Sequence, residues 1–220
     1  MSRKRKRARI RPRFAAAWLA VLFLLAGGAA RYRQIHSRLP GEDVAAPEYV
    51  TEDFLSVNPF SRPGTELKKI RGVVIHYVGN PGTTAQANRN YFEGLSAGTD
   101  GVYASAHFIV GLDGKVIQCV PLTEESYASN SRNGDTVAVE VCHPDETGQF
   151  SDTTYARTVE LTAWLCREFR LNPVKDVIRH YDVTGKECPK YYVEHPEAWE
   201  QFRTDVKAEL ERQRAAGKGT

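Results

Sequence analysis

A short stretch near residue 180 gathers side chains that could bind a metal ion and assist a hydrolysis. His180, Lys186 and Cys188 lie within nine residues, in a turn-rich segment that follows a short apolar run. Imidazole nitrogen and thiolate sulfur are the protein ligands that zinc prefers, and a nearby ammonium group can stabilise a developing negative charge. A catalytic zinc site needs three protein ligands, so the third must come from elsewhere in the chain.

The third ligand can be sought among the other histidines, which are His36, His76, His107, His143 and His195. His76 stands apart from the rest because it lies near the carboxyl end of the β-branched run over residues 69–78, which predicts a buried strand. Sheets of α/β proteins place their sites at such strand ends. A lone strand histidine is more often a core residue than a ligand, but the presence of His180 and Cys188 favours the ligand interpretation.

The chain resembles the type 2 N-acetylmuramoyl-L-alanine amidases, a family that includes the peptidoglycan recognition proteins and the phage lysozyme-amidases. Four stretches occur in the family's order: VVIHYVGNPG, SAHFIVGLDGKVIQCVP, NGDTVAVEV and RHYDVTGKECP. The resemblance covers residues 54–210, and the last stretch is its most specific part. It implies a zinc ion (Zn²⁺) held by His76, His180 and Cys188, with Lys186 close to the metal.

One position departs from the family pattern. Many members carry a Tyr directly before the hairpin His, where this chain has Ala106 before His107. Members without that Tyr carry a Glu in the strand that matches TVAVEVC, and Glu140 stands at that place. Because Val139 and Val141 must face the core, Glu140 points to the opposite face, as a cleft-facing general base would.

We therefore expect Glu140 to take a proton from the attacking water and return it to the leaving amine, and Lys186 to stabilise the tetrahedral oxyanion. The alternative for each residue is a solvated side chain, on a half-exposed sheet face for Glu140 and in a loop for Lys186. His107 is either a support of the site or a strand histidine bonded to the backbone. Tyr77, Tyr127 and Asn130 could line a sugar or peptide groove.

The pattern of elements predicts a single α/β domain with a central mixed sheet flanked by helices and a zinc site at the sheet edge. Strands are expected over 69–78, 136–142 and 177–178, and Asp113-Gly114 indicates a hairpin between 106–110 and 115–120. Helices are expected over 84–95, with Ala87, Tyr91 and Leu95 on one face, and over 154–170. A last helix is expected from Pro196, with Trp199, Phe202, Val206 and Leu210 as its inner stripe.

Charge and hydropathy divide the chain. Eleven of the 30 Lys and Arg residues precede residue 40, whereas all 27 Asp and Glu residues follow it, so the rest of the chain carries a net charge of −8. This acidic body argues against nucleic acid as a partner. Residues 14–30 are uncharged and apolar behind the basic segment 1–13, which predicts a signal-anchor or a signal peptide. We expect a stalk over 31–52, the catalytic domain over 53–212 and a frayed tail over 213–220.

The predicted function is zinc-dependent hydrolysis of the amide bond between N-acetylmuramic acid and L-alanine, by a monomer that is membrane-anchored through residues 14–30 or secreted to the cell wall. Two alternatives stay open: a peptidoglycan-binding recognition module that does not cut, and a peptidase that uses Cys188 as nucleophile. Chelation separates the last case, because a thiol enzyme survives loss of zinc. Cys119, Cys142 and Cys166 lie in apolar strand or helix patterns, which predicts buried free thiols.

Overall fold

The structure is a computed structural model that describes residues 38–99 and 101–217, and its compact unit begins at Leu39. The strands are β1 (Val50–Glu52), β2 (Gly72–Tyr77), β3 (Phe108–Val110), β4 (Val116–Gln118), β5 (Thr136–Val141) and β6 (Val177–Arg179). The helices are α2 (Ala85–Gly94), α3 (Asp152–Glu168), α4 (Pro173–Asp176), α5 (Tyr181–Thr184), α6 (Lys190–Glu194) and α7 (Pro196–Ala216), with 3-10 turns η1 (Leu95–Ala97) and η2 (Asn130–Asp135).

The six strands form one mixed sheet in the order β1-β4-β3-β5-β2-β6. The hairpin pair β3 and β4 is antiparallel, and the other neighbouring pairs are parallel. The predicted mixed α/β sheet and its hairpin are therefore confirmed. The most apolar strands, β2 and β5, lie side by side in the interior of the sheet, where both faces are covered.

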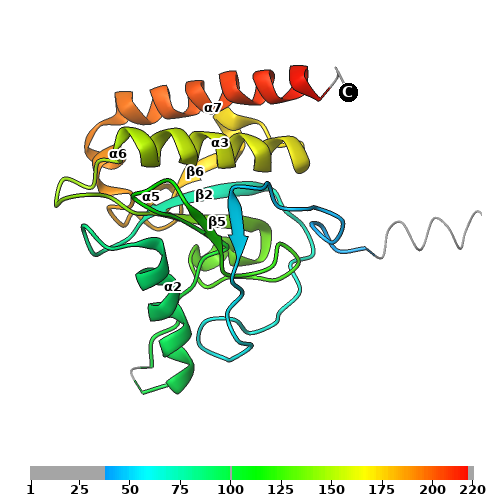
Figure 1. Cartoon of the computed structure of the whole chain (residues 1–220), viewed down its shortest axis with the longest axis vertical. Coiled ribbons are helices and arrows are strands. Elements are labelled where there is room, and N and C mark those ends of the chain that lie inside the picture. Colours follow the sequence, from blue (N-terminus) through cyan, green and yellow to red (C-terminus); the bar gives the residue numbers. More distant parts are fainter. Residues whose placement is uncertain (1–37, 100, 218–220) are drawn as a thin grey trace, which may run out of the picture. The chain divides into compact units, whose positions relative to one another are not determined.

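Helices cover both faces of the sheet (Figure 1). The larger core lies under α3 and α7, where Val73 and Ile75 of β2 meet Leu161 of α3 and Phe202 of α7. The other face carries α2, whose Phe92 packs in a smaller core with Ile109 and Ala138. Because side chains alternate along a strand, His76 and Glu140 point towards this second face.

The ends of the long helices follow from their sequences. Thr84 caps α2 by accepting a hydrogen bond from the Ala87 amide at 3.1 Å, and Ser151 caps α3 by accepting one from the Thr154 amide. Pro196 occupies the first turn of α7, where its missing amide hydrogen is not needed. All four residues of the predicted α7 stripe, Trp199, Phe202, Val206 and Leu210, are buried.

Three sequence predictions differ from the structure. The domain begins at Leu39 rather than residue 53, because β1 pairs with β4 and Tyr49 packs on the larger core, so the predicted stalk over 31–52 is too long. Helix α7 continues to Ala216, beyond the predicted tail boundary at 213. In α2 the buried residues are Ala85, Asn88 and Phe92, and the face predicted for Ala87, Tyr91 and Leu95 is not uniformly buried, because Leu95 is buried whereas Tyr91 is 53 % exposed.

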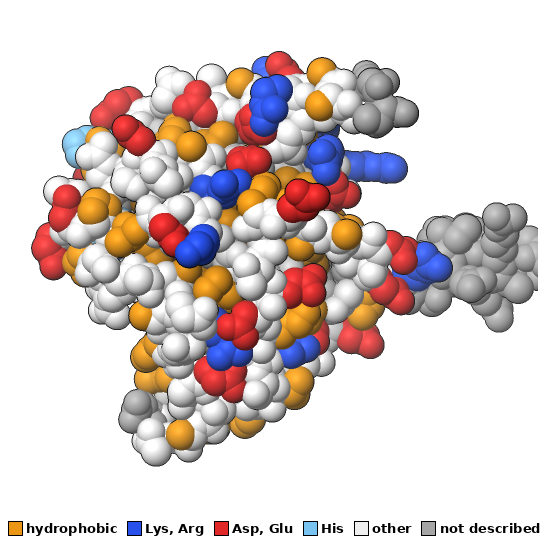
Figure 2. All heavy atoms as spheres, viewed as in Figure 1, with side chains coloured by type: hydrophobic (Ala, Val, Ile, Leu, Met, Phe, Trp, Pro, Cys, Tyr) orange, Lys and Arg blue, Asp and Glu red, His pale blue; other side chains and the backbone are white. Residues whose placement is uncertain are grey.

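The predicted membrane segment, residues 14–30, and the basic segment 1–13 lie outside the described residues. Within residues 38–99 and 101–217, no helix combines the length and the apolar character needed to cross a bilayer. On the face that Figure 2 shows, Asp and Glu side chains are spread over the surface and are interspersed with Lys and Arg, which form no continuous basic patch there. Cys119, Cys142 and Cys166 are buried and free, as predicted.

Candidate metal centre

Two adjacent parallel strands place His76 and Glu140 next to each other. In the register of β2 and β5, His76 pairs with Glu140, while Ile75 pairs with Val139 and Tyr77 with Val141. The valines and Ile75 fill the core under α3, so the histidine and the carboxylate share the opposite face near the carboxyl ends of both strands. This is the end of the sheet at which α/β proteins build their sites.

The segment after the edge strand β6 brings in the other two predicted ligands. The His180 amide donates to the carbonyl of Ile75 at 3.2 Å, which ties this segment to β2. The Tyr181 amide donates to the carbonyl of Cys188 at 2.8 Å and closes the loop between the two ligands. Gly185 ends α5 in the left-handed region at φ 78°, where a residue without a Cβ is favoured.

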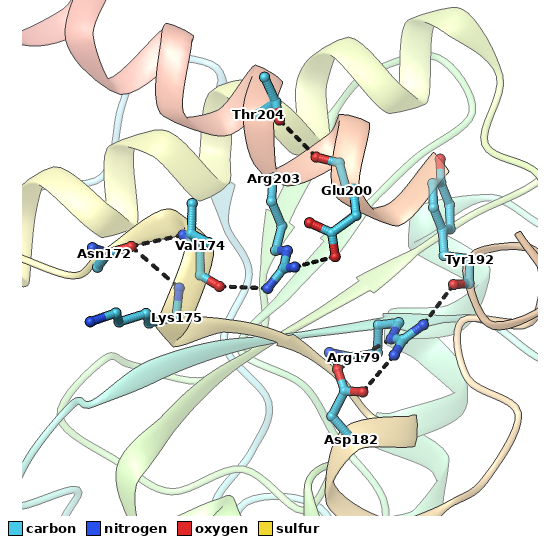
Figure 3. Close-up of polar contacts among 9 residues, drawn as sticks. All are labelled: Asn172, Val174, Lys175, Arg179, Asp182, Tyr192, Glu200, Arg203 and Thr204. Carbon is cyan, nitrogen blue, oxygen red and sulfur yellow. Dashed lines mark hydrogen bonds and ion pairs between the residues drawn. The ribbon is translucent and has the colours of Figure 1, made fainter. Parts of the chain in front are cut away.

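A guanidinium next to His180 holds this segment in place (Figure 3). Arg179 makes a two-pronged ion pair with Asp182, with Nη2 at 2.7 Å from Oδ1 and Nε at 3.2 Å from Oδ2. Its Nη1 also donates to the carbonyl of Tyr192 at 2.9 Å. The turn that carries His180 is therefore fastened both within itself and to α6, which limits the movement of the imidazole.

His76, His180 and Cys188 come together as a group that could hold a metal ion. Their ligand atoms all lie within 4.8 Å of one another. The Cys188 Sγ is 3.8 Å from His76 Nδ1, and the two imidazole centroids are 4.6 Å apart. All three side chains are buried. Among the described residues, one cysteine and two histidines make up this group, which is the ligand pattern of a catalytic zinc site with an open position.

The far nitrogen of each imidazole has its own hydrogen-bond partner. His180 Nε2 lies 3.0 Å from Asn130 Oδ1, and since an amide oxygen only accepts, this nitrogen carries the proton and leaves the lone pair on Nδ1. His76 Nε2 lies 3.2 Å from the Ser129 hydroxyl, which leaves Nδ1 on the side of Cys188. Such partners set the tautomer and the orientation of metal-binding histidines. The residues present therefore fit zinc.

Charge in this cluster is strongly disfavoured in the absence of a cation. Burial first, and then the neighbouring His180 and Lys186, hold the pKa of His76 well below its ordinary value, so its imidazole is neutral. Burial, and then Lys186, also lower the pKa of His180. Burial and the nearby Glu140 raise the pKa of the Cys188 thiol to about 12. A bound dication reverses the last effect, because a coordinating thiol is deprotonated outright.

Glu140 and Lys186 line the same cavity as the three predicted ligands, and its volume is about 410 Å³. The Oε2 atom of Glu140 is buried and has no hydrogen-bond partner among the described residues. Burial raises the pKa of this carboxyl to about 8, and the positive charge of Lys186 offsets part of that rise. A buried carboxyl with a raised pKa, next to three potential metal ligands, is a candidate for proton transfer in catalysis.

The other described histidines lie elsewhere. His107 is buried between β3 and β5 and bonds to the Glu124 carbonyl, the Ser126 hydroxyl and the Ala138 amide. Of the two roles that the sequence left open for His107, these contacts support that of a strand histidine bonded to the backbone. Both ring nitrogens of His143 face carbonyl oxygens, and His195 lies at the start of α7 beside Glu197.

Sequence reasoning missed the residues that orient the imidazoles. Asn130 was expected only as a groove residue, and Ser129 was not singled out. The turn that presents both is held by Asn133, whose Oδ1 accepts from the amides of Ala128 at 3.2 Å and Ser129 at 2.6 Å. Asn130 itself has a positive φ of 51°, which asparagine tolerates better than most residues. The only signal in the sequence was this run of short polar residues.

The chain is similar to known cell-wall amidases. The family model described as N-acetylmuramoyl-L-alanine amidase matches residues 66–191. Among curated proteins, N-acetylmuramoyl-L-alanine amidase BlyA of Bacillus subtilis (strain 168) is 32% identical over 180 residues, which cover 73% of this chain and 47% of that protein. N-acetylmuramoyl-L-alanine amidase CwlL of Bacillus licheniformis is 32% identical over 170 residues, with 71% and 46% covered. The chain thus spans about half the length of the curated relatives it matches.

Solved structures give the same fold. The catalytic domain of XlyA superposes with a TM-score of 0.60 at 24% identity, over 71% of this chain and 98% of that one. The structure of PlyL superposes with a TM-score of 0.59 at 21% identity, over 71% and 96% of the two chains. The mixed sheet with its flanking helices is therefore shared with these domains.

Proposed function

Since the chain belongs to the N-acetylmuramoyl-L-alanine amidase family, we propose that it hydrolyses the amide bond between the lactyl group of N-acetylmuramic acid and L-alanine in peptidoglycan. The observation that carries this proposal is the cavity in which His76, His180 and Cys188 meet Glu140 and Lys186. Three potential metal ligands, a buried carboxyl and an ammonium group are the parts that metal-assisted hydrolysis of an amide needs.

The three ligands would hold one zinc ion, with the imidazoles kept neutral by burial and oriented by Ser129 and Asn130. When bound, zinc supplies a Lewis acid for the amide carbonyl and makes water a stronger nucleophile at neutral pH.

In this proposal Glu140 transfers the proton from the attacking water to the leaving group. Its buried Oε2 has no competing hydrogen bond among the described residues, so it can accept the proton of the attacking water. The same oxygen then donates the proton to the leaving nitrogen of L-alanine, which departs as a neutral amine. Its pairing with His76 across two adjacent strands fixes the carboxyl beside the metal ligands.

Lys186 neutralises the oxygen that becomes negative in the tetrahedral intermediate. The residue lines the cavity and lowers the pKa of His76, His180 and Glu140 through its charge, which indicates that its ammonium group acts across this space. A charge that acts in a site with little water contributes more to catalysis than the same charge in solution.

The structural features do not favour the alternative of a Cys188 nucleophile. The thiol is buried, and burial raises its pKa to about 12, whereas reactive cysteines are accessible and have a lowered pKa. A recognition module without activity would be expected to lack a ligand or the base, and all four residues are present here.

Digestion of purified peptidoglycan tests the proposal. The zinc-loaded full chain should release new L-alanine amino termini, detected by mass spectrometry, and excess chelator should abolish the release. Glu140→Gln should retain one equivalent of zinc and lose activity by about 10²–10⁴-fold. Cleavage within the peptide or the glycan would refute the amidase assignment. Turnover by Glu140→Gln near the wild-type rate would remove Glu140 from the mechanism.

We also propose that this chemistry takes place at the cell wall, with residues 14–30 as the export or anchoring segment. Fractionation of cells that express the full chain, followed by N-terminal sequencing, distinguishes an anchor from a cleaved signal. Recovery of the whole chain in the cytosolic fraction would contradict export.

A further inference from the structure

A second cavity lies on the face of the sheet opposite to the metal centre, where α3 and α7 lie side by side (Figure 1). Its walls are the segment 45–49, α3 and the last turns of α7, and its volume is about 300 Å³. The family model matches residues 66–191, so two of these three walls lie outside the part of the chain that it describes. The family therefore does not account for this cavity.

Two side chains in the lining carry a buried oxygen atom that has no hydrogen-bond partner among the described residues. These atoms are Tyr49 Oη and Gln213 Oε1. The orientation of the Gln213 amide is fixed, because its Nε2 donates to the carbonyl of Glu160 at 3.1 Å and to Glu209 Oε1 at 2.8 Å. Its oxygen can only accept. A buried polar atom without a partner lowers stability, so a ligand that supplies the missing partner gains affinity.

The Tyr49 hydroxyl is a neutral group that can donate. Burial, and then the nearby carboxylate of Glu160, raise the pKa of Tyr49 above its ordinary value. The guanidinium of Arg157 covers the ring at 4.3 Å from its centroid and holds it in place. The cavity thus offers a donor at Tyr49 and an acceptor at Gln213, which match the carbonyl and the N–H of a peptide unit.

The charged side chains of the lining favour an anion. Arg167 and Arg212 are partly exposed, and each holds a neighbouring glutamate through Nε and Nη2. The Nη1 group of each guanidinium is left for an anion, and guanidinium groups bind carboxylates well. The carboxylate in the lining, Glu160, pairs with Arg157 at 2.7 Å, so it does not cancel the charge of the two arginines.

We propose that this cavity binds the carboxyl end of a short peptide. The N–H of the last peptide unit donates to Gln213 Oε1, its carbonyl accepts from the Tyr49 hydroxyl, and the terminal carboxylate lies between Arg167 and Arg212. A small apolar side chain packs on Trp164, which also lines the cavity. The volume is at the lower end of the range for ligand pockets, so only a small ligand fits.

The proposed function makes a stem peptide of peptidoglycan the source of this carboxyl end, and this part of the proposal rests on the proposed function. The site would then give the chain a second contact with its substrate, on the opposite face of the sheet from the metal centre.

An NMR titration of the zinc-loaded full chain tests the site, with N-acetyl-D-alanyl-D-alanine as the probe. The probe should shift the side-chain amide signals of Gln213 and the backbone amide of Tyr49, with a dissociation constant of about 1 mM for a ligand of this size. The carboxamide of the same dipeptide should bind about 10-fold more weakly, because it lacks the charge that Arg167 and Arg212 bind.

Tyr49→Phe and Tyr155→Phe are matched variants. Tyr49→Phe keeps the ring and its contact with Arg157, so it should weaken binding of the probe by about 5–10-fold without lowering the melting temperature of the free chain. Tyr155 does not line this cavity, and its hydroxyl donates to Asp205 Oδ2 at 2.7 Å. Tyr155→Phe should therefore lower the melting temperature and leave the binding unchanged.

An absence of saturable binding, or shifts confined to the metal centre, would overturn the site. A loss of stability in Tyr49→Phe as large as that in Tyr155→Phe would show that the Tyr49 hydroxyl has a partner in the free chain, and would remove the basis of the proposal. Binding of the L,L form of the dipeptide alone would overturn a stem peptide as the source. Binding is measured without cleavage, so a chain that binds the probe but cuts no peptidoglycan keeps this site and loses the proposed function. The reverse result refutes the site alone.

Discussion

Acidification should destabilise the fold through His107, a residue away from the metal centre. The imidazole is fully buried, and its Nε2 donates to the carbonyl of Glu124 at 2.9 Å. Its Nδ1 accepts from the Ala138 amide at 3.0 Å and also lies 3.0 Å from the Ser126 hydroxyl. A proton on Nδ1 would break the bond to the Ala138 amide, so the folded state requires the neutral imidazole.

The magnitude follows from the pKa. Burial lowers the pKa of His107 from its ordinary 6.5 to about 4 in the folded protein. The unfolded chain therefore takes up a proton as the pH falls below 6.5, while the folded chain does not until about pH 4. Because the unfolded state binds more protons in this window, the free energy of unfolding decreases as the pH falls. Linkage gives a loss of about 2 kcal/mol between pH 7 and pH 5.

Urea unfolding of the wild type and His107→Asn at pH 7, 6 and 5, in one zinc-containing buffer, measures this term. At pH 7 the variant should be less stable by about 1–3 kcal/mol, since buried hydrogen-bond partners are left unpaired. By pH 5 that difference should shrink by about 2 kcal/mol, because only the wild type contains His107, whose protonation in the unfolded state lowers the free energy of unfolding. Other groups titrate alike in both proteins and cancel.

A difference in stability that stays constant from pH 7 to pH 5 would refute the buried neutral imidazole. Zinc affinity gives a second check, since His107 bonds to backbone and Ser126 rather than to a predicted ligand. We expect the zinc dissociation constant of His107→Asn at pH 7 to match that of the wild type. A weakening of tenfold or more would return His107 to the role of a support of the metal centre.

Two further predictions concern the metal centre. Ser129→Ala and Asn130→Gly should each weaken zinc binding by about 10–100-fold in competition with a chelator, because the imidazoles lose the partners that orient them. Glycine suits position 130 because it keeps the positive φ, so an unchanged affinity would show that the amide does not orient His180. Lys186→Met should lower kcat by about 10²–10³-fold while zinc content stays at one equivalent. A kcat within twofold of the wild type would show that Lys186 does not stabilise the oxyanion.

The sequence predicts those parts of the fold that depend on a long, regular pattern. The stripe of α7 from Trp199 to Leu210 was predicted correctly because four apolar residues at helical spacing leave one possible inner face. The approach of His76 to His180 and Cys188 was expected from strand-end placement and from the family resemblance, and the structure brings the three side chains together.

Features that depend on tertiary contacts could not be predicted in the same way. In α2, Tyr91 and Phe92 are adjacent aromatics, and the inner one is chosen by packing against Ile109 and Ala138. The three-residue strand β1 has no pattern of its own and exists through its pairing with β4. The turn at Ser129 and Asn130 depends on the side-chain amide of Asn133, which local sequence does not reveal.

The register between β2 and β5 has a consequence for how such a chain can be engineered. Side chains alternate between the two faces of a sheet, so His76 and Glu140 reach the cavity only because their neighbours in β2 and β5 face the core. Removing one residue between Gly72 and Ile75 would shift His76 back by one position, turn its imidazole towards α3 and bring Tyr77 into its place. A point substitution in β2 or β5 therefore alters one side chain and leaves the others in place. A single-residue deletion there would instead remove His76 or Glu140 from the cavity. Length variation therefore belongs in the connecting loops rather than in these two strands.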